Sequence, residues 1–118
     1  MFKDWPGLVK ELGGPLRGLR GGADETMKAF SGIAQAALKP GALDTKTKEL
    51  IALAIGVAAR CDDCIAFHVK AALAQGATRE EVMETLAMAI YMGAGPSVMY
   101  AAHAAEAYEQ FAAQQKTG

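Results

Sequence analysis

The chain lacks an excess of charge of either sign, and this absence limits its partners. Its 118 residues carry 12 lysines and arginines against 13 aspartates and glutamates, which gives a formal net charge of −1 at pH 7. Proteins that bind nucleic acid or anionic membranes usually present a basic patch that supplies the electrostatic attraction. The balanced composition therefore argues against both kinds of partner.

Long uninterrupted apolar segments are also missing. The N-terminal stretch has no apolar core of the kind that defines a secretory signal, because Lys3 and Pro6 interrupt it. The longest uncharged run, residues 85–105, contains Gly95 and Pro96, which favour two helices that meet at a turn over a membrane span. We therefore expect a cytoplasmic protein without a transmembrane helix.

Cysteine is scarce as well, since the chain contains only Cys61 and Cys64. Static disulfides are uncommon in the reducing cytoplasm, so a Cys-x-x-Cys pair there is more typical of redox catalysis or metal binding. Two buried cysteines without chemistry are the alternative, because free cysteine packs as a small apolar residue. Any functional interpretation starts from this pair.

Apolar residues, by contrast, are abundant and make up 52% of the chain. Their spacing is helical, so we predict an all-α, single-domain helical bundle of about five to six helices. The domain would span residues 1–118, with a core at about 25–115 and a short helix and glycine-rich loop in residues 1–23. A small, nearly neutral domain has difficulty hiding so much apolar surface, which predicts a homo-oligomer.

The first half of the chain is predicted to contain three helices. The first, residues 1–12, is amphipathic, and the glycines and proline of the GGPLRGLRGG segment after it predict a loop. Asp24 is a candidate N-cap for a helix that ends near residue 38 and packs through its apolar face. Asp44 caps the next helix, which ends near residue 59 and is apolar nearly all round, so we expect it to be buried on several sides.

The second half begins with the helix of the cysteine pair. Thr78 and Glu81 then form a capping box for the following helix, since each side chain can bond the backbone N–H of the other. Pro96 fits the first position of a last helix, which ends near residue 114. His103, in that last helix, lies among alanines and is predicted to be a packed or hydrogen-bonded structural residue.

The cysteine pair lies at a predicted helix N-terminus, because the segment after Cys64 has helical apolar spacing. At ~100° per residue, Cys61, Cys64 and His68 share one stripe, and the imidazole leans back towards Cys64. Cys61 lies ~10 Å from His68 along the helix axis and depends on the helix dipole instead. Both environments favour a thiolate, whereas Asp62 and Asp63 in the first turn oppose it.

Glu49 lies twelve residues before Cys61 and completes the pattern Glu…Cys-x-x-Cys-x-x-x-His. Over residues 25–115 the chain resembles the AhpD-like alkylhydroperoxidases, a family grouped with the carboxymuconolactone decarboxylases. The resemblance implies a thiol-dependent peroxidase in which Cys64 is peroxidatic and Cys61 is resolving. His68 would be the base and Glu49 the proton relay, and no cofactor or metal is implied.

The resemblance also implies partners: a hydroperoxide substrate, an external dithiol reductant such as a lipoyl or thioredoxin-like protein, and further copies of the chain in a trimer or hexamer. Asp63 departs from the pattern, because some members carry a histidine there. The contact between Glu49 and His68 is likewise implied by the resemblance, since a simple antiparallel hairpin leaves them staggered. Close approach at Gly56, an oblique helix crossing or a bridging water would bring them together.

Several alternatives stay open at this point. Cys61, at the exposed start of the helix, could attack first. The two cysteines with His68 and Glu49 could instead form a tetrahedral zinc site, or the chain could be a peroxide sensor or a decarboxylase-like enzyme on the same fold. Glu49 could also be a solvated surface residue.

Four methionines and two tyrosines in the second half of the chain could line an adaptable apolar pocket for an organic hydroperoxide, since methionine accommodates irregular shapes. Filling of the core or of a subunit interface is the more common role of such residues. The residues concerned are Met83, Met88, Met92, Met99, Tyr91 and Tyr100.

Overall fold

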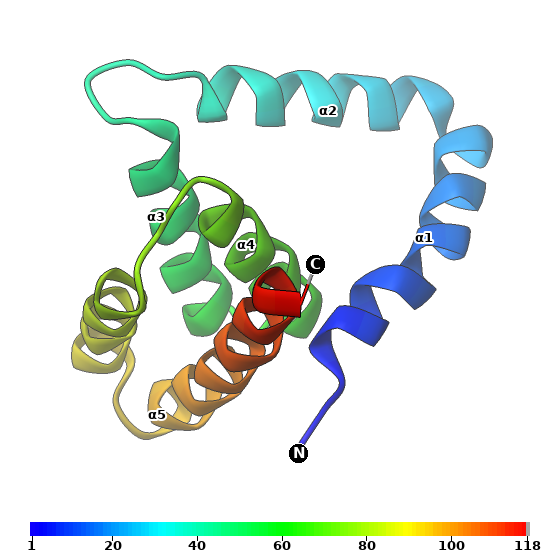
Figure 1. Ribbon diagram of the computed structural model, residues 1–118. Helices are drawn as coiled ribbons and strands as arrows, with labels where there is room; N and C mark the ends of the chain where they lie inside the picture. The colour runs from blue at the N-terminus through cyan, green and yellow to red at the C-terminus, as the bar shows by residue number, and fades with distance from the viewer. Residues whose placement is uncertain (118) are drawn as a thin grey trace.

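The computed structural model describes residues 1–117, which form five helices and no strand. The helices are α1 (Trp5–Gly22), α2 (Asp24–Leu38), α3 (Thr45–Ala58), α4 (Asp62–Ala74) and α5 (Arg79–Thr117). Figure 1 shows α3, α4 and α5 gathered in a bundle, whereas α1 and α2 form an arm around one side of it. The predicted all-α bundle is therefore confirmed. Across residues 1–117, no helix combines the length and apolar character that a membrane span requires.

The central helix of the bundle is α3, which packs against both α4 and α5. Leu53 and Val57 of α3 are fully buried and belong to the same apolar cluster as Ile65 and Val69 of α4 and Val82 of α5. Burying a large aliphatic side chain contributes roughly 1.5–3 kcal/mol. The prediction that this helix is buried on several sides is confirmed for the sides that face α4 and α5, whereas Ile51 and Ile55 on another side are 44% and 62% exposed. The buried contacts hold the three helices together.

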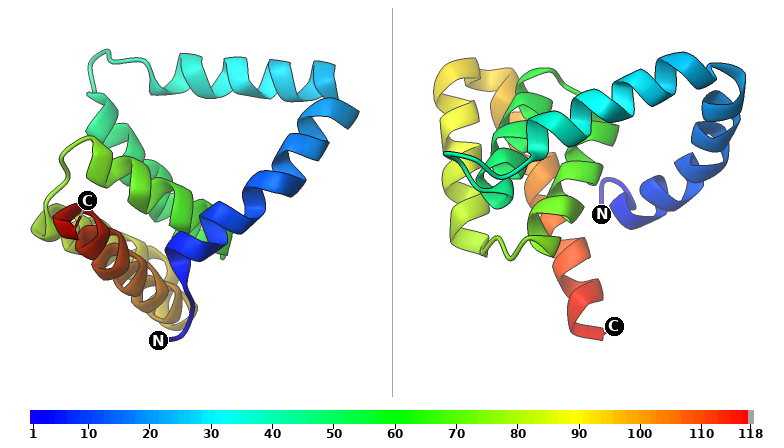
Figure 2. Two further views of the ribbon diagram at one scale, coloured as in Figure 1. Left: turned by 45° about the vertical axis from the view of Figure 1, so that its right-hand side comes forward. Right: turned by 90° about the horizontal axis from the view of Figure 1, so that it is seen from above.

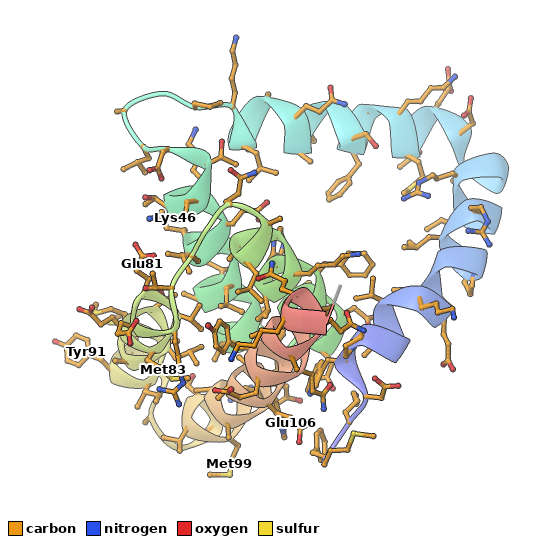
Figure 3. The ribbon with its side chains drawn as sticks, in the orientation of Figure 1. Lys46, Glu81, Met83, Tyr91, Met99 and Glu106 are labelled. Atoms are coloured by element: carbon orange, nitrogen blue, oxygen red, sulfur yellow. A yellow bond between two sulfur atoms is a disulfide. The ribbon has the colours of Figure 1, made fainter. Side chains whose placement is uncertain are left out.

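Local hydrogen bonds start α3 and α5 where the sequence predicts. The Asp44 carboxylate accepts a hydrogen bond from the Thr47 N–H at 2.7 Å, and the Thr47 contacts lower the pKa of Asp44. Thr78 and Glu81 form the reciprocal capping box, with distances of 2.8 Å and 3.1 Å. Lys46 lies 2.8 Å from Glu81 and is the main cause of that carboxyl's lowered pKa, followed by the Thr78 N–H (Figure 3).

A sharp turn divides α5 into two helical segments. Ala94, at the turn, has a φ of 54° and a ψ of −141°, and Pro96 follows it near the start of the second segment. A Cβ on Gly93 would lie only 1.9 Å from the hydroxyl oxygen of the buried Ser97, so glycine is required there. The predicted meeting of two helices at this point is confirmed.

The glycine-rich segment differs from its prediction. Residues 13–22, expected to be a loop, belong to α1, which is bent but helical from Trp5 to Gly22 (Figure 1). Gly76 is the one glycine with a positive φ among those described, so the glycines of α1 adopt ordinary helical backbone. Glycine in a helix costs about 1 kcal/mol relative to alanine but does not forbid the conformation. The loop prediction was wrong because it treated this cost as a break.

The helix predicted after residue 24 is present as α2, but its surroundings differ from the prediction. Asp24 is its first helical residue and pairs with Lys28 at 3.1 Å, while Ala23 occupies the N-cap. No residue of α2 is buried, and Phe30 and Ile33 are 61% and 64% exposed. Figure 2 shows why, since α1 carries α2 to the periphery of the molecule. The apolar face of α2 is therefore covered only in part in the single chain, where Met27, Ala34 and Leu38 are half-buried.

The segment before α1 is bound to α5. Trp5 is fully buried, and its indole N–H donates a hydrogen bond to Glu106 Oε1 at 2.9 Å. The same carboxylate accepts from the backbone N–H groups of Phe2 at 2.8 Å and Lys3 at 2.9 Å. The Phe2 bond, followed by the Lys3 bond, lowers the pKa of Glu106. The start of the chain is thus tied to a residue more than a hundred positions later.

Candidate active site

Cys61 and Cys64 are joined by a disulfide at the start of α4. Cys61 is the N-cap of the helix, and its sulfur accepts a hydrogen bond from the Cys64 N–H at 3.1 Å. Both residues are partly exposed. The pair therefore lies at the positive end of the helix dipole, where a thiolate would be favoured, and is accessible to molecules from solvent.

A tight turn between α3 and α4 fixes the position of Cys61. Arg60 adopts a left-handed backbone with a φ of 56°, which is uncommon for a residue with a side chain. The N–H of Arg60 donates to the carbonyl of Val57 at 3.1 Å, and the N–H of Cys61 donates to that of Gly56 at 3.0 Å. These bonds close the end of α3 and direct the chain at once into α4.

Glu49 and His68 meet between α3 and α4. His68 Nδ1 lies 2.7 Å from Glu49 Oε1, and the side chains are 32% and 8% exposed respectively. A carboxylate with so little contact with water needs a partner, because desolvation of its charge is costly. The contact that the family resemblance implied is confirmed, and the alternative of a solvated Glu49 is wrong.

Gly56 explains how two helices joined by a short turn bring these residues together. A Cβ on Gly56 would lie 3.3 Å from the Cβ of Cys64 and 3.6 Å from the backbone nitrogen of Ile65. The absence of that atom lets α4 approach the backbone of α3 closely at the level of the cysteine pair. Of the three possibilities left by the sequence, the close approach at Gly56 is present, and the contact of Glu49 with His68 is direct.

An apolar cavity of ≈ 350 Å³ opens beside His68. Its walls come from Ala34 and Ala37 of α2 and from Ile51 and Ile55 of α3. Sequence reasoning missed this cavity, because its walls belong to two helices whose packing is not specified by either one. The available signals were the apolar face of α2 and the four-residue spacing of Ile51 and Ile55.

None of the described methionines lines the cavity beside His68. Met88 and Met92 line a second cavity of ≈ 440 Å³, together with Ile55 and Arg60. They are 59% and 78% exposed, and Met99 is 59% exposed. These three side chains therefore do not fill the core of the single chain.

His103 lies in an aromatic cluster. Its ring stacks on Phe2 with a centroid distance of 4.2 Å and meets the edge of Tyr100 at 5.1 Å. It also lies 6.2 Å from the ring of Trp5. These contacts are those of a packed side chain, as predicted.

The zinc alternative gains no support from the geometry. Within residues 1–117, no three histidine, cysteine, aspartate or glutamate side chains are grouped so that they could hold a metal ion. The sulfur atoms of Cys61 and Cys64 are bonded to each other and so do not serve as thiolate ligands. The arrangement is instead a disulfide at a helix start, one turn from a histidine that contacts a buried carboxylate.

This helical bundle, with its cysteine pair and its glutamate–histidine contact, agrees with a comparison against protein families. The model of the carboxymuconolactone decarboxylase family matches residues 24–107. The chain belongs to this family.

Individual relatives support the assignment. The crystal structure of a family member from Legionella pneumophila has a TM-score of 0.88 and 52% identity, and the alignment covers 91% of this chain and 96% of that chain. A member from Thermotoga maritima, for which an antioxidative role has been suggested, has a TM-score of 0.74 and 34% identity over 79% of this chain and 96% of its own. An uncharacterized Haemophilus influenzae protein is 48% identical over 108 residues, which are 92% of this chain and 96% of its own.

Proposed function

We propose that this protein is a thiol-dependent peroxidase that reduces hydroperoxides while Cys61 and Cys64 cycle between dithiol and disulfide. One observation carries the proposal. The cysteine pair forms a partly exposed disulfide at the start of α4, and one helical turn beyond Cys64 lies His68, whose Nδ1 contacts buried Glu49 at 2.7 Å. The antioxidative role suggested for the Thermotoga maritima relative points the same way.

In this mechanism His68 is the base and Glu49 is the proton relay. Because Nδ1 faces a carboxylate, the neutral imidazole holds its proton on Nδ1 and offers Nε2 as the acceptor. His68 then takes the proton of the Cys64 thiol, and Glu49 stabilises the imidazolium that forms. The position of Cys64 one turn before His68 on the same helix supports its assignment as the attacking residue.

The bond changes follow from thiol chemistry. The Cys64 thiolate attacks a peroxide oxygen, so an S–O bond forms and the O–O bond breaks. The alcohol or water leaves with the proton from His68, and Cys64 becomes a sulfenic acid. The Cys61 thiol then attacks the Cys64 sulfur, which forms the disulfide and releases water. An external dithiol, lipoyl or thioredoxin-like, reduces the pair by exchange and is itself oxidised to a disulfide.

The cavity beside His68 supports an organic hydroperoxide as substrate. Most of its walls are aliphatic, whereas hydrogen peroxide has no apolar part to bind there. An alkyl group in this cavity would place its peroxide near the histidine. We therefore expect a lower KM for an organic hydroperoxide than for hydrogen peroxide.

The proposal includes assembly into a homo-oligomer, a trimer or hexamer, in the cytoplasm. Large apolar side chains are exposed on several elements, among them Phe30 and Ile33 on α2, Ile55 on α3, and Tyr91 and Met92 on α5. Figure 3 shows Tyr91 projecting from the edge of the molecule. Contact with other copies would cover these side chains and remove their apolar surface from water.

Turnover with hydrogen peroxide and an organic hydroperoxide, in the presence of dihydrolipoamide or thioredoxin, tests the proposed reaction. Cys64→Ser should abolish peroxide consumption. Cys61→Ser should permit one attack and leave a sulfenic acid or mixed disulfide on Cys64, which mass spectrometry detects. A decarboxylase activity of the purified protein that survives alkylation of both thiols would instead indicate a decarboxylase-like enzyme.

A further inference from the structure

Lys3 lies beside the first turn of α4, although the two are 59 residues apart in the sequence. Its ammonium group forms an ion pair with the carboxylate of Asp62, the residue that follows Cys61. The two side chains are 35% and 26% exposed, so water screens the pair only in part. Lys3 also lies outside residues 24–107, the part of the chain that matches the family model.

The structure holds Lys3 in this position through its backbone. Its N–H donates to Glu106 Oε1 at 2.9 Å, and its carbonyl accepts from Gln110 Nε2 at 2.9 Å. The ammonium group lies 5.4 Å from the ring centroid of buried Trp5. A surface lysine usually loses much conformational freedom when it forms an ion pair, which makes such pairs weak. Here the backbone is held and the ammonium group also lies over the ring of Trp5, so two contacts besides the ion pair keep the cation close to Asp62.

The charge near Cys61 depends on this ion pair. The charged or titratable residues around the cysteine pair come from the N-terminal segment, α1, the α3–α4 turn, α3, α4 and α5. They are Lys3, Asp4, Glu11, Arg60, Glu49, Asp62, Asp63, His68 and Glu106, of which Asp4 and Glu11 line one surface pocket with Lys3 and Asp63. A carboxylate next to a thiol disfavours the thiolate. Asp63 is exposed and therefore screened by solvent, whereas Asp62 is partly buried. Asp62 thus needs a nearby cation if it is not to oppose ionisation of the cysteine pair.

We propose that Lys3 is a positioning residue that preserves the thiolate of the reduced Cys61–Cys64 pair by offsetting the charge of Asp62. It acts through Asp62 and does not touch the substrate. The first turn of α4 can therefore carry an acidic residue without losing the effect of the helix dipole on the cysteines. The inference depends on the proposed function only in that the disulfide must be reducible.

The test measures how fast iodoacetamide alkylates the reduced protein between about pH 5 and pH 9, a range in which cysteine thiols of proteins lose their proton. Mass mapping gives the rate for each cysteine. Lys3→Gln should slow alkylation at neutral pH by about threefold or more and move the profile to higher pH, because the charge of Asp62 is then unbalanced. Asp62→Asn should speed alkylation. The double variant should return close to the wild-type profile.

Two further variants separate charge from structure. Lys3→Arg keeps the cation and should keep the wild-type profile. Lys10→Gln removes an exposed cation from the same part of the chain and should also have no effect. Circular dichroism and Trp5 fluorescence would confirm that each variant retains its fold.

An unchanged profile in folded Lys3→Gln would overturn the inference, as would a double variant that remains as slow as Lys3→Gln. The ion pair would then only anchor the N-terminal segment. If Lys3→Gln does not fold, the Asp62→Asn variant tests the inference instead. An alkylation profile that Asp62→Asn leaves unchanged would show that the charge of Asp62 does not affect the cysteines. No peroxide is present, so these results are independent of whether the protein turns over hydroperoxides.

Discussion

The bundle helices α3 and α4 and the arm helices α1 and α2 differ in what they bury. Leu53 and Val57 of α3 have no exposed surface, whereas α2 has no buried residue and α1 buries only Trp5. Both regions carry apolar residues at helical spacing. Apolar spacing therefore defines a face of a helix but does not specify what covers it.

The two regions also contribute differently to the candidate site. The bundle supplies the cysteine pair and the Glu49–His68 contact, which need fixed positions. The arm supplies Ala34 and Ala37 to the cavity beside His68, where apolar surface is sufficient. Substitutions in the bundle should therefore affect chemistry, and substitutions in the arm should affect binding or assembly.

The largest difference should appear in the rate at which peroxide modifies Cys64. Glu49→Gln and His68→Ala should each lower this rate by about 10²- to 10⁴-fold at neutral pH, because each removes part of the base. Higher pH should restore it in part. Lys28→Gln, on the arm, should leave it unchanged. A pH profile of Cys64 that Glu49→Gln leaves unchanged would refute the relay, and mass mapping that shows Cys61 reacting first would make Cys61 the attacking residue.

A second contrast concerns stability. Leu53→Ala should lower the free energy of unfolding by about 2–5 kcal/mol, since it leaves a cavity in the core. Ile33→Ala, on exposed α2, should change it by less than about 0.5 kcal/mol in the dilute monomer. Urea unfolding measures both. Light scattering should show weaker self-association of Ile33→Ala, and equal destabilisation by the two changes would mean that α2 packs on its own chain.

Replacement of glycine by alanine should lower the stability of the protein at one position and raise it at another. At Gly56 the new Cβ would lie 3.3 Å from the Cβ of Cys64, so we expect a destabilisation of about 1–2 kcal/mol despite the better helix propensity. At Gly32 of α2 nothing lies within 4 Å, so alanine should stabilise by about 0.4–1 kcal/mol. Thermal unfolding gives both signs. A stabilised Gly56→Ala would show that α3 and α4 have room to separate.

The smallest expected effect is the pH dependence of the N-terminal anchor. The pKa of Glu106 is lowered in the folded protein, first by the Phe2 N–H, so its contribution to stability is complete above the unfolded pKa and is lost as pH falls through the folded one. The chain has a single tryptophan, Trp5, which donates to this carboxylate. Its fluorescence should therefore change in acid, below about pH 4. Glu106→Gln should remove this transition, and its persistence would assign the change to other carboxyls.

Several features of the fold could be predicted because they depend on neighbouring residues. Asp44 and Thr47 are three positions apart, as are Thr78 and Glu81, and both caps are present. The same spacing places Cys61 and Cys64 at the start of one helix. The glycine-rich part of α1 was mispredicted, because glycine content indicates a low propensity for helix formation but gives no information on the contacts that stabilise the helix.

From the sequence alone could be predicted most of the helices, the caps of α3 and α5 and the stripe that carries the cysteines and His68. Tertiary structure alone decided the contact of Glu49 with His68, which are 19 residues apart, and that of Lys3 with Asp62, which are 59 apart. The first depends on how closely α3 and α4 approach at Gly56, and the second on the docking of the N-terminal segment against Glu106. The physical reason is reach: a cap forms within one turn of the chain, whereas these pairs form only after whole helices have packed.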